Sequence, residues 1–97
     1  MHFPRLIVAF TSILISSSAF AELNTDRPGG DYKNFFIAVE PLEVCENACM
    51  HDALCKAWTL VKKGIQGPQW HCWLKSSIPP PVKSDCCISG TKGQPID

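Results

Sequence analysis

The sequence predicts a small α+β domain in which one helix packs on antiparallel strands and disulfide bonds hold the two together. Three observations support this prediction: one segment with helical periodicity, two strand-like segments joined by a turn-rich loop, and six cysteines in a chain of 97 residues. A chain of this length holds at most one small domain. An apolar core of that size is marginally stable by itself, so covalent cross-links are the expected supplement.

The first 21 residues have the layout of a secretory signal peptide. A short basic start precedes an apolar stretch from Leu6 to Ile15, and a small-x-small motif ends at Ala21. The apolar stretch is too short to cross a bilayer, for which about 20 residues are needed. We therefore expect cleavage after Ala21 and export to the periplasm or out of the cell. The mature domain, residues 22–97, should not stay inserted in a membrane.

The first half of the mature part is expected to form a loop, a short strand and the helix. Residues 22–34 are rich in turn formers and predict a loop. The aromatic and β-branched run 35–39 is typical of a strand. The helix is expected from Leu42 to about Asp52. Its spacing gathers four side chains on one face: Leu42, Cys45, Ala48 and Cys49.

The second half predicts a β-hairpin and a closing strand. Two segments look like strands: residues 56–61 and 70–75. Segment 62–68 between them contains the glycines and proline of a hairpin loop. The prolines of segment 78–81 cannot donate to a sheet, so the chain should leave the sheet there. Residues 87–89 could return as a closing strand, and the chain is expected to fray from Gly90 onward.

Alternation along the second strand of the hairpin separates two faces. The face expected in the core carries Trp70, Cys72 and Leu74. The opposite face carries His71, Trp73 and Lys75.

Two tryptophans are candidates for ligand contact. Trp58 and Trp73 could share the face away from the helix, where exposed rings would form an amphipathic platform for a protein or glycan partner. The alternative is that the loop at residues 78–82 covers both rings. Lys62 and Lys63 in the hairpin loop could contact an acidic partner or simply remain solvated.

All six cysteines lie in the mature part, where export favours disulfides: Cys45, Cys49, Cys55, Cys72, Cys86 and Cys87. Cys45 and Cys49 are one helical turn apart on the same face, a separation poorly suited to a bond between them. Cys55 can fold back to Cys49 across a short turn. This leaves Cys45 to pair with Cys72 on the hairpin.

The adjacent pair Cys86 and Cys87 leaves several possibilities open. The two could form a vicinal disulfide, pair with a partner chain or with other cysteines, or stay reduced as a redox or soft-metal site. Zinc ligation with His51 and His71 lacks Cys-x2-Cys spacing, so no metal is expected. The two histidines are expected at the helix end and on a strand surface.

The sequence argues against catalysis and against a nucleic-acid partner. Bridged cysteines cannot act as nucleophiles, and neither a Ser/His/Asp pattern nor a phosphate-binding glycine loop stands out. We therefore expect no catalytic residue and no cofactor. Nine basic residues balance nine acidic ones, which gives no basic face for nucleic acid.

Four segments together resemble the bacterial branch of the PAN/apple domains: Asn24-Thr25-Asp26-Arg27-Pro28-Gly29-Gly30-Asp31-Tyr32, Cys45-x3-Cys49-x5-Cys55-x-Ala57-Trp58-Thr59, Cys72-Trp73-Leu74-Lys75 and Cys86-Cys87-x-Ser89-Gly90. The resemblance implies an antiparallel sheet of four or five strands that cradles one helix, with nested Cys45–Cys72 and Cys49–Cys55 bridges. It also implies a non-catalytic module that binds proteins or carbohydrates. Apple domains proper have a further cysteine pair between their terminal strands, so the resemblance does not imply the pairing of Cys86 with Cys87.

The hypothesis from the sequence is an exported, single-domain binding module for an unidentified protein or glycan. Its recognition surface would be formed by exposed strand faces and the loop at residues 62–69. A thiol-redox or soft-metal-handling protein that works through Cys86 and Cys87 is the alternative from another class. A third possibility is a structural subunit that docks through Trp58 and Trp73.

Overall fold

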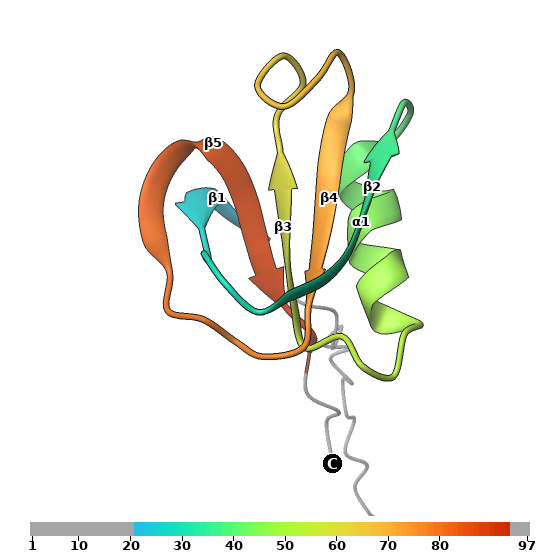
Figure 1. Ribbon diagram of the computed structural model, residues 1–97, viewed down its shortest axis with the longest axis vertical. Helices are drawn as coiled ribbons and strands as arrows, with labels where there is room; N and C mark the ends of the chain where they lie inside the picture. The colour runs from blue at the N-terminus through green and yellow to red at the C-terminus, as the bar shows by residue number, and fades with distance from the viewer. Residues whose placement is uncertain (1–20, 94–97) are drawn as a thin grey trace, which may run out of the picture.

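The computed structural model describes residues 21–93, which form five strands and one helix (Figure 1). In chain order these are β1 (Ala21–Asp26), β2 (Asp31–Ile37), α1 (Pro41–Met50), β3 (Ala57–Val61), β4 (Trp70–Lys75) and β5 (Val82–Thr91). Except for Ala21, the predicted signal peptide lies outside the described residues, as do residues 94–97 of the predicted tail. Within the described part, the helix is neither long nor apolar enough to cross a membrane.

The five strands form one antiparallel sheet in the order β1-β5-β3-β4-β2. The central strand β3 pairs with β4 in the predicted hairpin and with β5 on its other side. Helix α1 covers one face of the sheet and packs against β3, β4 and β2 (Figure 1). Residues 76–81 connect β4 to β5 outside the sheet, as their prolines predict. The predicted α+β architecture is confirmed.

Helix α1 begins with a proline and ends at an aspartate-stabilised turn. Pro41 occupies the first turn, where its missing N–H leaves no helical hydrogen bond unmade. The helix ends at Met50, before the predicted end at Asp52. The chain turns there because the Asp52 carboxylate accepts a hydrogen bond from the backbone N–H of Leu54, 3.0 Å away. The same bond holds the pKa of Asp52 below its ordinary value.

The core lies between the helix and the sheet, around the fully buried side chains of Trp58, Leu60 and Leu74. Two disulfides cross this layer. Cys45–Cys72 joins the helix to β4, and Cys49–Cys55 closes the turn after the helix. Both predicted bridges are confirmed.

Trp58 shares its face of the sheet with Leu74 and not with Trp73. The register pairs Trp58 with Leu74 and Thr59 with Trp73. Since residues directly opposite each other in neighbouring strands point to the same face, Trp58 lies under the helix, where it is buried. The prediction that Trp58 and Trp73 share an open face is wrong, because the periodicity of each strand alone does not define their register.

Residues 22–34 form most of two strands, so the predicted loop there is wrong. Only residues 27–30 connect β1 to β2, and Gly29 and Gly30 supply the positive φ angles of this turn, 108° and 73°. The two strands lie at opposite edges of the sheet and carry many solvated side chains; Leu23, for example, is 69% exposed. Backbone hydrogen bonds to β5 and β4 hold these polar sequences in the sheet, and in β2 they are helped by Tyr32, which packs against the core.

The bounds of two other strands differ from the predicted ones. Strand β2 ends at Ile37, whereas the prediction placed a strand over residues 35–39. Strand β5 is longer than the predicted closing strand at residues 87–89, because it pairs with β3 along one side and with β1 along the other. Gly90, where fraying was expected to begin, is held by both neighbours.

Candidate ligand-binding hollow

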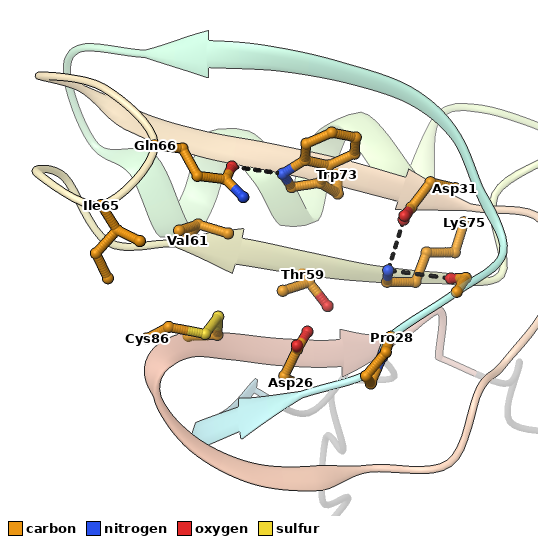
Figure 2. Close-up of a pocket in the computed structure, with 12 residues that line it drawn as sticks. Asp26, Pro28, Asp31, Thr59, Val61, Ile65, Gln66, Trp73, Lys75 and Cys86 are labelled. Atoms are coloured by element: carbon orange, nitrogen blue, oxygen red, sulfur yellow. Dashed lines mark hydrogen bonds and ion pairs between the residues drawn. A yellow bond between two sulfur atoms is a disulfide. The ribbon is translucent and has the colours of Figure 1, made fainter.

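The face of the sheet opposite the helix carries a hollow with a volume of about 290 Å³ (Figure 2). Strands β3 and β4 form its floor. The connection from β1 to β2 borders the hollow on one side. The hairpin loop between β3 and β4 borders it on another side, together with Cys86 and Cys87 of β5. The polar and aromatic groups that line it come from segments far apart in the sequence: Asp26, Asp31, Thr59, Gln66, Trp73 and Lys75.

The hairpin loop folds over the open face and is attached to it through Gln66. The Gln66 Oε1 atom accepts a hydrogen bond from the indole N–H of Trp73, at 2.9 Å, and contacts the Nδ1 atom of His71. Gly67 lies against the ring of Phe36, where a Cβ atom would come within 3.2 Å of a ring carbon. With its oxygen directed at Trp73 and His71, the Gln66 side chain presents its amide nitrogen to the hollow (Figure 2).

His71 lies beneath this loop, so its predicted position on the strand surface is wrong. His71 is 7% exposed, and its imidazole stacks on Phe36, with ring centroids 4.1 Å apart. Its Nε2 atom lies 2.8 Å from Oδ1 of Asn34. Burial lowers the pKa of His71 and so favours the neutral ring. When that ring donates from Nδ1 to Gln66, its Nε2 atom is an acceptor, which pairs with Asn34 once the Asn34 amide turns its NH2 group toward it. His51, by contrast, lies exposed at the end of α1, as predicted.

A buried lysine fixes the β1–β2 connection to β4. The Lys75 side chain is almost fully buried, and its Nζ atom lies 2.6 Å from Asp31 Oδ1. The same ammonium donates to the backbone oxygen of Gly29 at 3.1 Å (Figure 2). A buried ammonium must be paired to be tolerated, so the pair holds Asp31 at the edge of the hollow.

Arg27 braces the same connection against the segment that follows β4. Its guanidinium makes two hydrogen bonds to the Glu22 carboxylate, at 3.1 and 3.0 Å. It also donates to the backbone oxygen of Pro79 at 2.7 Å. Because this arginine is 8% exposed, water competes little for these bonds, and the border of the hollow is held from both ends.

The hydroxyl groups of Thr59 on β3 and Ser89 on β5 form a chain of hydrogen bonds in which each donor can be assigned. Ser89 Oγ donates to the backbone oxygen of Thr25 at 2.9 Å. It must therefore accept the hydrogen of the Thr59 hydroxyl, 2.7 Å away. Thr59 thus faces the hollow as a hydrogen-bond acceptor, near the Asp26 carboxylate (Figure 2). Asp26 forms no ion pair with any residue in the range 21–93.

The adjacent cysteines lie at the border of the hollow. The structure joins Cys86 to Cys87, one of the possibilities left open by the sequence. A carboxylate oxygen of Asp26 and the two sulfur atoms all lie within 4.8 Å of one another. Cys87 is buried against β3, whereas Cys86 is partly exposed.

The structure separates the four residues predicted to contact a ligand. Trp73 lines the hollow, but Trp58 is buried in the core and cannot reach a ligand. Lys62 and Lys63 belong to the hairpin loop and do not line the hollow. Neither lysine forms an ion pair with a residue that the structure describes.

Several residues of the hollow were not named from the sequence as ligand contacts: Asp26, Asp31, Thr59, Gln66 and Lys75. Gln66 nevertheless belongs to the loop at residues 62–69, which was expected to form part of the recognition surface. A signal existed for the ion pair, because Lys75 on the strand implies a nearby carboxylate if the strand is covered. Thr59 and Gln66 offered no comparable signal. Their positions depend on the register of the hairpin and on the path of its loop, neither of which periodicity defines.

The profile of the PAN domain family matches residues 25–75, more than half of the chain. The matched segment extends from β1 to the end of β4 and includes both core disulfides. The searches of curated proteins and of solved structures found no match. PAN domains are generally non-catalytic modules that bind proteins or carbohydrates. The chain belongs to the PAN domain family.

Proposed function

We propose that this PAN domain is an exported binding module that recognises a carbohydrate in the hollow of its open face. The observation that carries the proposal is the combination of an aromatic ring with fixed polar groups around one small cavity. A sugar ring has both apolar C–H faces and hydroxyl groups. It therefore requires an apolar surface and hydrogen-bonding partners in the same place.

The groups around the hollow match this requirement individually. The half-buried indole of Trp73 offers apolar surface. Thr59 and Asp26 can accept hydrogens from sugar hydroxyls, and the amide nitrogen of Gln66 can donate to a sugar oxygen. Trp73, Thr59 and Gln66 are already held by hydrogen bonds within the domain, so binding would require little additional ordering.

Export remains part of the proposal. The disulfides of the domain fit an oxidising compartment. The predicted signal peptide would deliver the chain to the periplasm or beyond the cell, in line with the bacterial branch that the sequence resembles.

A protein ligand is the second candidate, because two exposed apolar side chains lie close to the hollow. Phe36 is 50% exposed and lies against Gly67 of the hairpin loop. Ile65 is 55% exposed and belongs to the same loop, where it lines the hollow. A partner chain could bury these side chains beside the hollow without using its polar groups.

The test is a glycan-array screen of the mature protein, followed by titration of the best ligand against matched variants. Thr59→Val and Trp73→Ala should each weaken binding at least about tenfold, which corresponds to about 1.4 kcal/mol. Leu54→Ala, an exposed residue that does not line the hollow, should bind like the unmodified protein. A glycan that binds all these variants equally would place recognition elsewhere. A protein partner lost with Phe36→Ala but retained by Thr59→Val would favour the second candidate.

A further inference from the structure

We propose that reduction of the Cys86–Cys87 bond creates a zinc site from the two thiolates and the carboxylate of Asp26. The proposal does not depend on carbohydrate binding. It rests on the juxtaposition of three potential ligand atoms from β1 and β5, which lie within 4.8 Å of one another. Asp26 comes from a strand that is distant from Cys86 and Cys87 in the sequence and adjacent to them in the sheet.

The distances suit a single metal ion. Zinc binds thiolate sulfur at about 2.3 Å and carboxylate oxygen at about 2.0–2.2 Å. Three ligand atoms around one tetrahedral zinc ion therefore lie within about 4 Å of each other. The observed cluster would need side-chain rotation after reduction but no change in the pairing of β1 with β5. A water molecule would complete the tetrahedral set.

Charge and hydrogen bonding also favour a cation at this place. Two thiolates and one carboxylate more than neutralise a divalent ion, and Asp26 forms no ion pair with the described residues that zinc would have to disrupt. The Ser84 hydroxyl already donates to the Cys86 sulfur, at 3.3 Å. It can keep donating to the thiolate, which would orient that ligand.

This disulfide is the one that reduction can open without loss of the fold. Cys45–Cys72 and Cys49–Cys55 lie in the core, with all four residues at most 1% exposed, whereas Cys86 is partly exposed. Accessible disulfides are reduced more readily than buried ones. Cys86–Cys87 also closes the shortest possible loop. Its reduction should therefore raise the conformational entropy of the unfolded chain very little, and the stability of the domain should hardly change.

The chemistry balances with a dithiol reductant. Two electrons and two protons pass from the dithiol to Cys86–Cys87, the S–S bond breaks, two thiols form, and the reductant becomes a disulfide. Zinc then bonds to both sulfur atoms and displaces their two protons, while Asp26 contributes a carboxylate oxygen. Reoxidation would release the ion, so the site would bind zinc only in the reduced state.

The first experiment establishes which bond opens. The mature full-length chain would be treated under native conditions with limiting reductant, and free thiols would be alkylated and mapped by mass spectrometry. Labels should appear on Cys86 and Cys87 only, with the circular dichroism spectrum unchanged. Opening of a core disulfide at the same reductant concentration, or loss of the fold, would overturn the proposal.

The second experiment measures zinc by native mass spectrometry and by competition with a chromophoric chelator. The reduced chain should bind one zinc ion and the oxidised chain none. Asp26→Asn should weaken zinc binding at least about tenfold, since even indirect partners of metal ligands contribute 10- to 100-fold. Asp85→Asn removes the same charge beside Cys86 in sequence but lies outside the cluster, so it should leave the affinity unchanged.

Two results would refute the site directly. Equal zinc affinity in Asp26→Asn and Asp85→Asn would show that the carboxylate is not a ligand. Zinc binding that persists in the double variant Cys86→Ser/Cys87→Ser would assign the ion to other groups.

Discussion

His71 makes the stability of the domain depend on pH, because its buried ring contacts Gln66 of the hairpin loop. Burial lowers the pKa of its ring, so the folded domain favours the neutral form that can donate to Gln66. The unfolded chain titrates near the ordinary histidine pKa, about 6.5, and binds more protons than the folded chain just below that pH. The free energy of unfolding should therefore fall as the pH drops from 7 toward 5.5, and this contribution should level off above 7.

Urea unfolding at a series of pH values in this window would measure the effect. The variant His71→Gln lacks the titrating ring, so its stability should change much less over the same range. An identical pH dependence in the variant would show that another group is responsible.

The pair between Lys75 and Asp31 predicts an asymmetric response to substitution. Asp31→Asn keeps an oxygen that can accept a hydrogen bond from Lys75 but removes the negative charge beside a buried ammonium, and should cost about 1–3 kcal/mol of stability. Adding Lys75→Met to that variant removes the unpaired charge and should recover part of the loss. Chemical denaturation of both variants is the measurement. A double variant no more stable than Asp31→Asn alone would contradict this account.

At the scale of elements, the two kinds of disulfide should differ in what they stabilise. Cys45–Cys72 has a sequence separation of 27 and ties α1 to β4, so Cys45→Ala/Cys72→Ala should cost about 3–4 kcal/mol in the chain-entropy account. Cys86→Ser/Cys87→Ser removes a loop of two residues and should cost only about 1 kcal/mol. Comparison of denaturation midpoints tests this, and similar losses in both variants would be evidence against it.

The elements that could be predicted from the sequence are those with a strong internal pattern. The hairpin strands β3 and β4 and the apolar face of α1 follow from periodicity, and the two core bridges follow from where those elements place their cysteines. Strand β1 and the first half of β2 escaped prediction because neighbouring strands hold them through backbone hydrogen bonds, while their polar side chains show no apolar alternation. The second half of β2 was predicted as part of the strand at residues 35–39, where Phe35 and Ile37 pack against the core. The position of Trp58 required the register of β3 against β4.

The whole molecule has two layers, and the hollow lies on the face of the sheet that the helix leaves uncovered. A single thin core in so small a domain predicts that the covalent bonds decide whether it folds. Complete reduction of all three disulfides should abolish the cooperative thermal transition, whereas reduction of Cys86–Cys87 alone should preserve it. Calorimetry of the two preparations is the check. A cooperative transition in the fully reduced chain would mean that the core alone suffices.

The candidate site was less predictable than the fold because it is assembled from segments that lie far apart in the sequence. Trp73 could be selected because tryptophan on an outer strand face stands out in a sequence. Asp26, Thr59 and Gln66 are common polar residues, and they matter only because the fold brings the end of an edge strand, a central strand and a hairpin loop around the same cavity.

The pairing of β1 with β5 brings the two ends of the domain close together, which determines how the domain can be joined to other proteins. Glu22, the first residue of the predicted mature chain, lies directly opposite Ser89, and paired Cα atoms in an antiparallel sheet are only about 4.5–5.5 Å apart. The chain therefore enters and leaves the sheet at neighbouring points. A host protein could accept this domain as an insertion into one of its surface loops, and a circularly permuted version could join the two points with a short linker. Neither residue lines the hollow, so ligand access would survive both rearrangements.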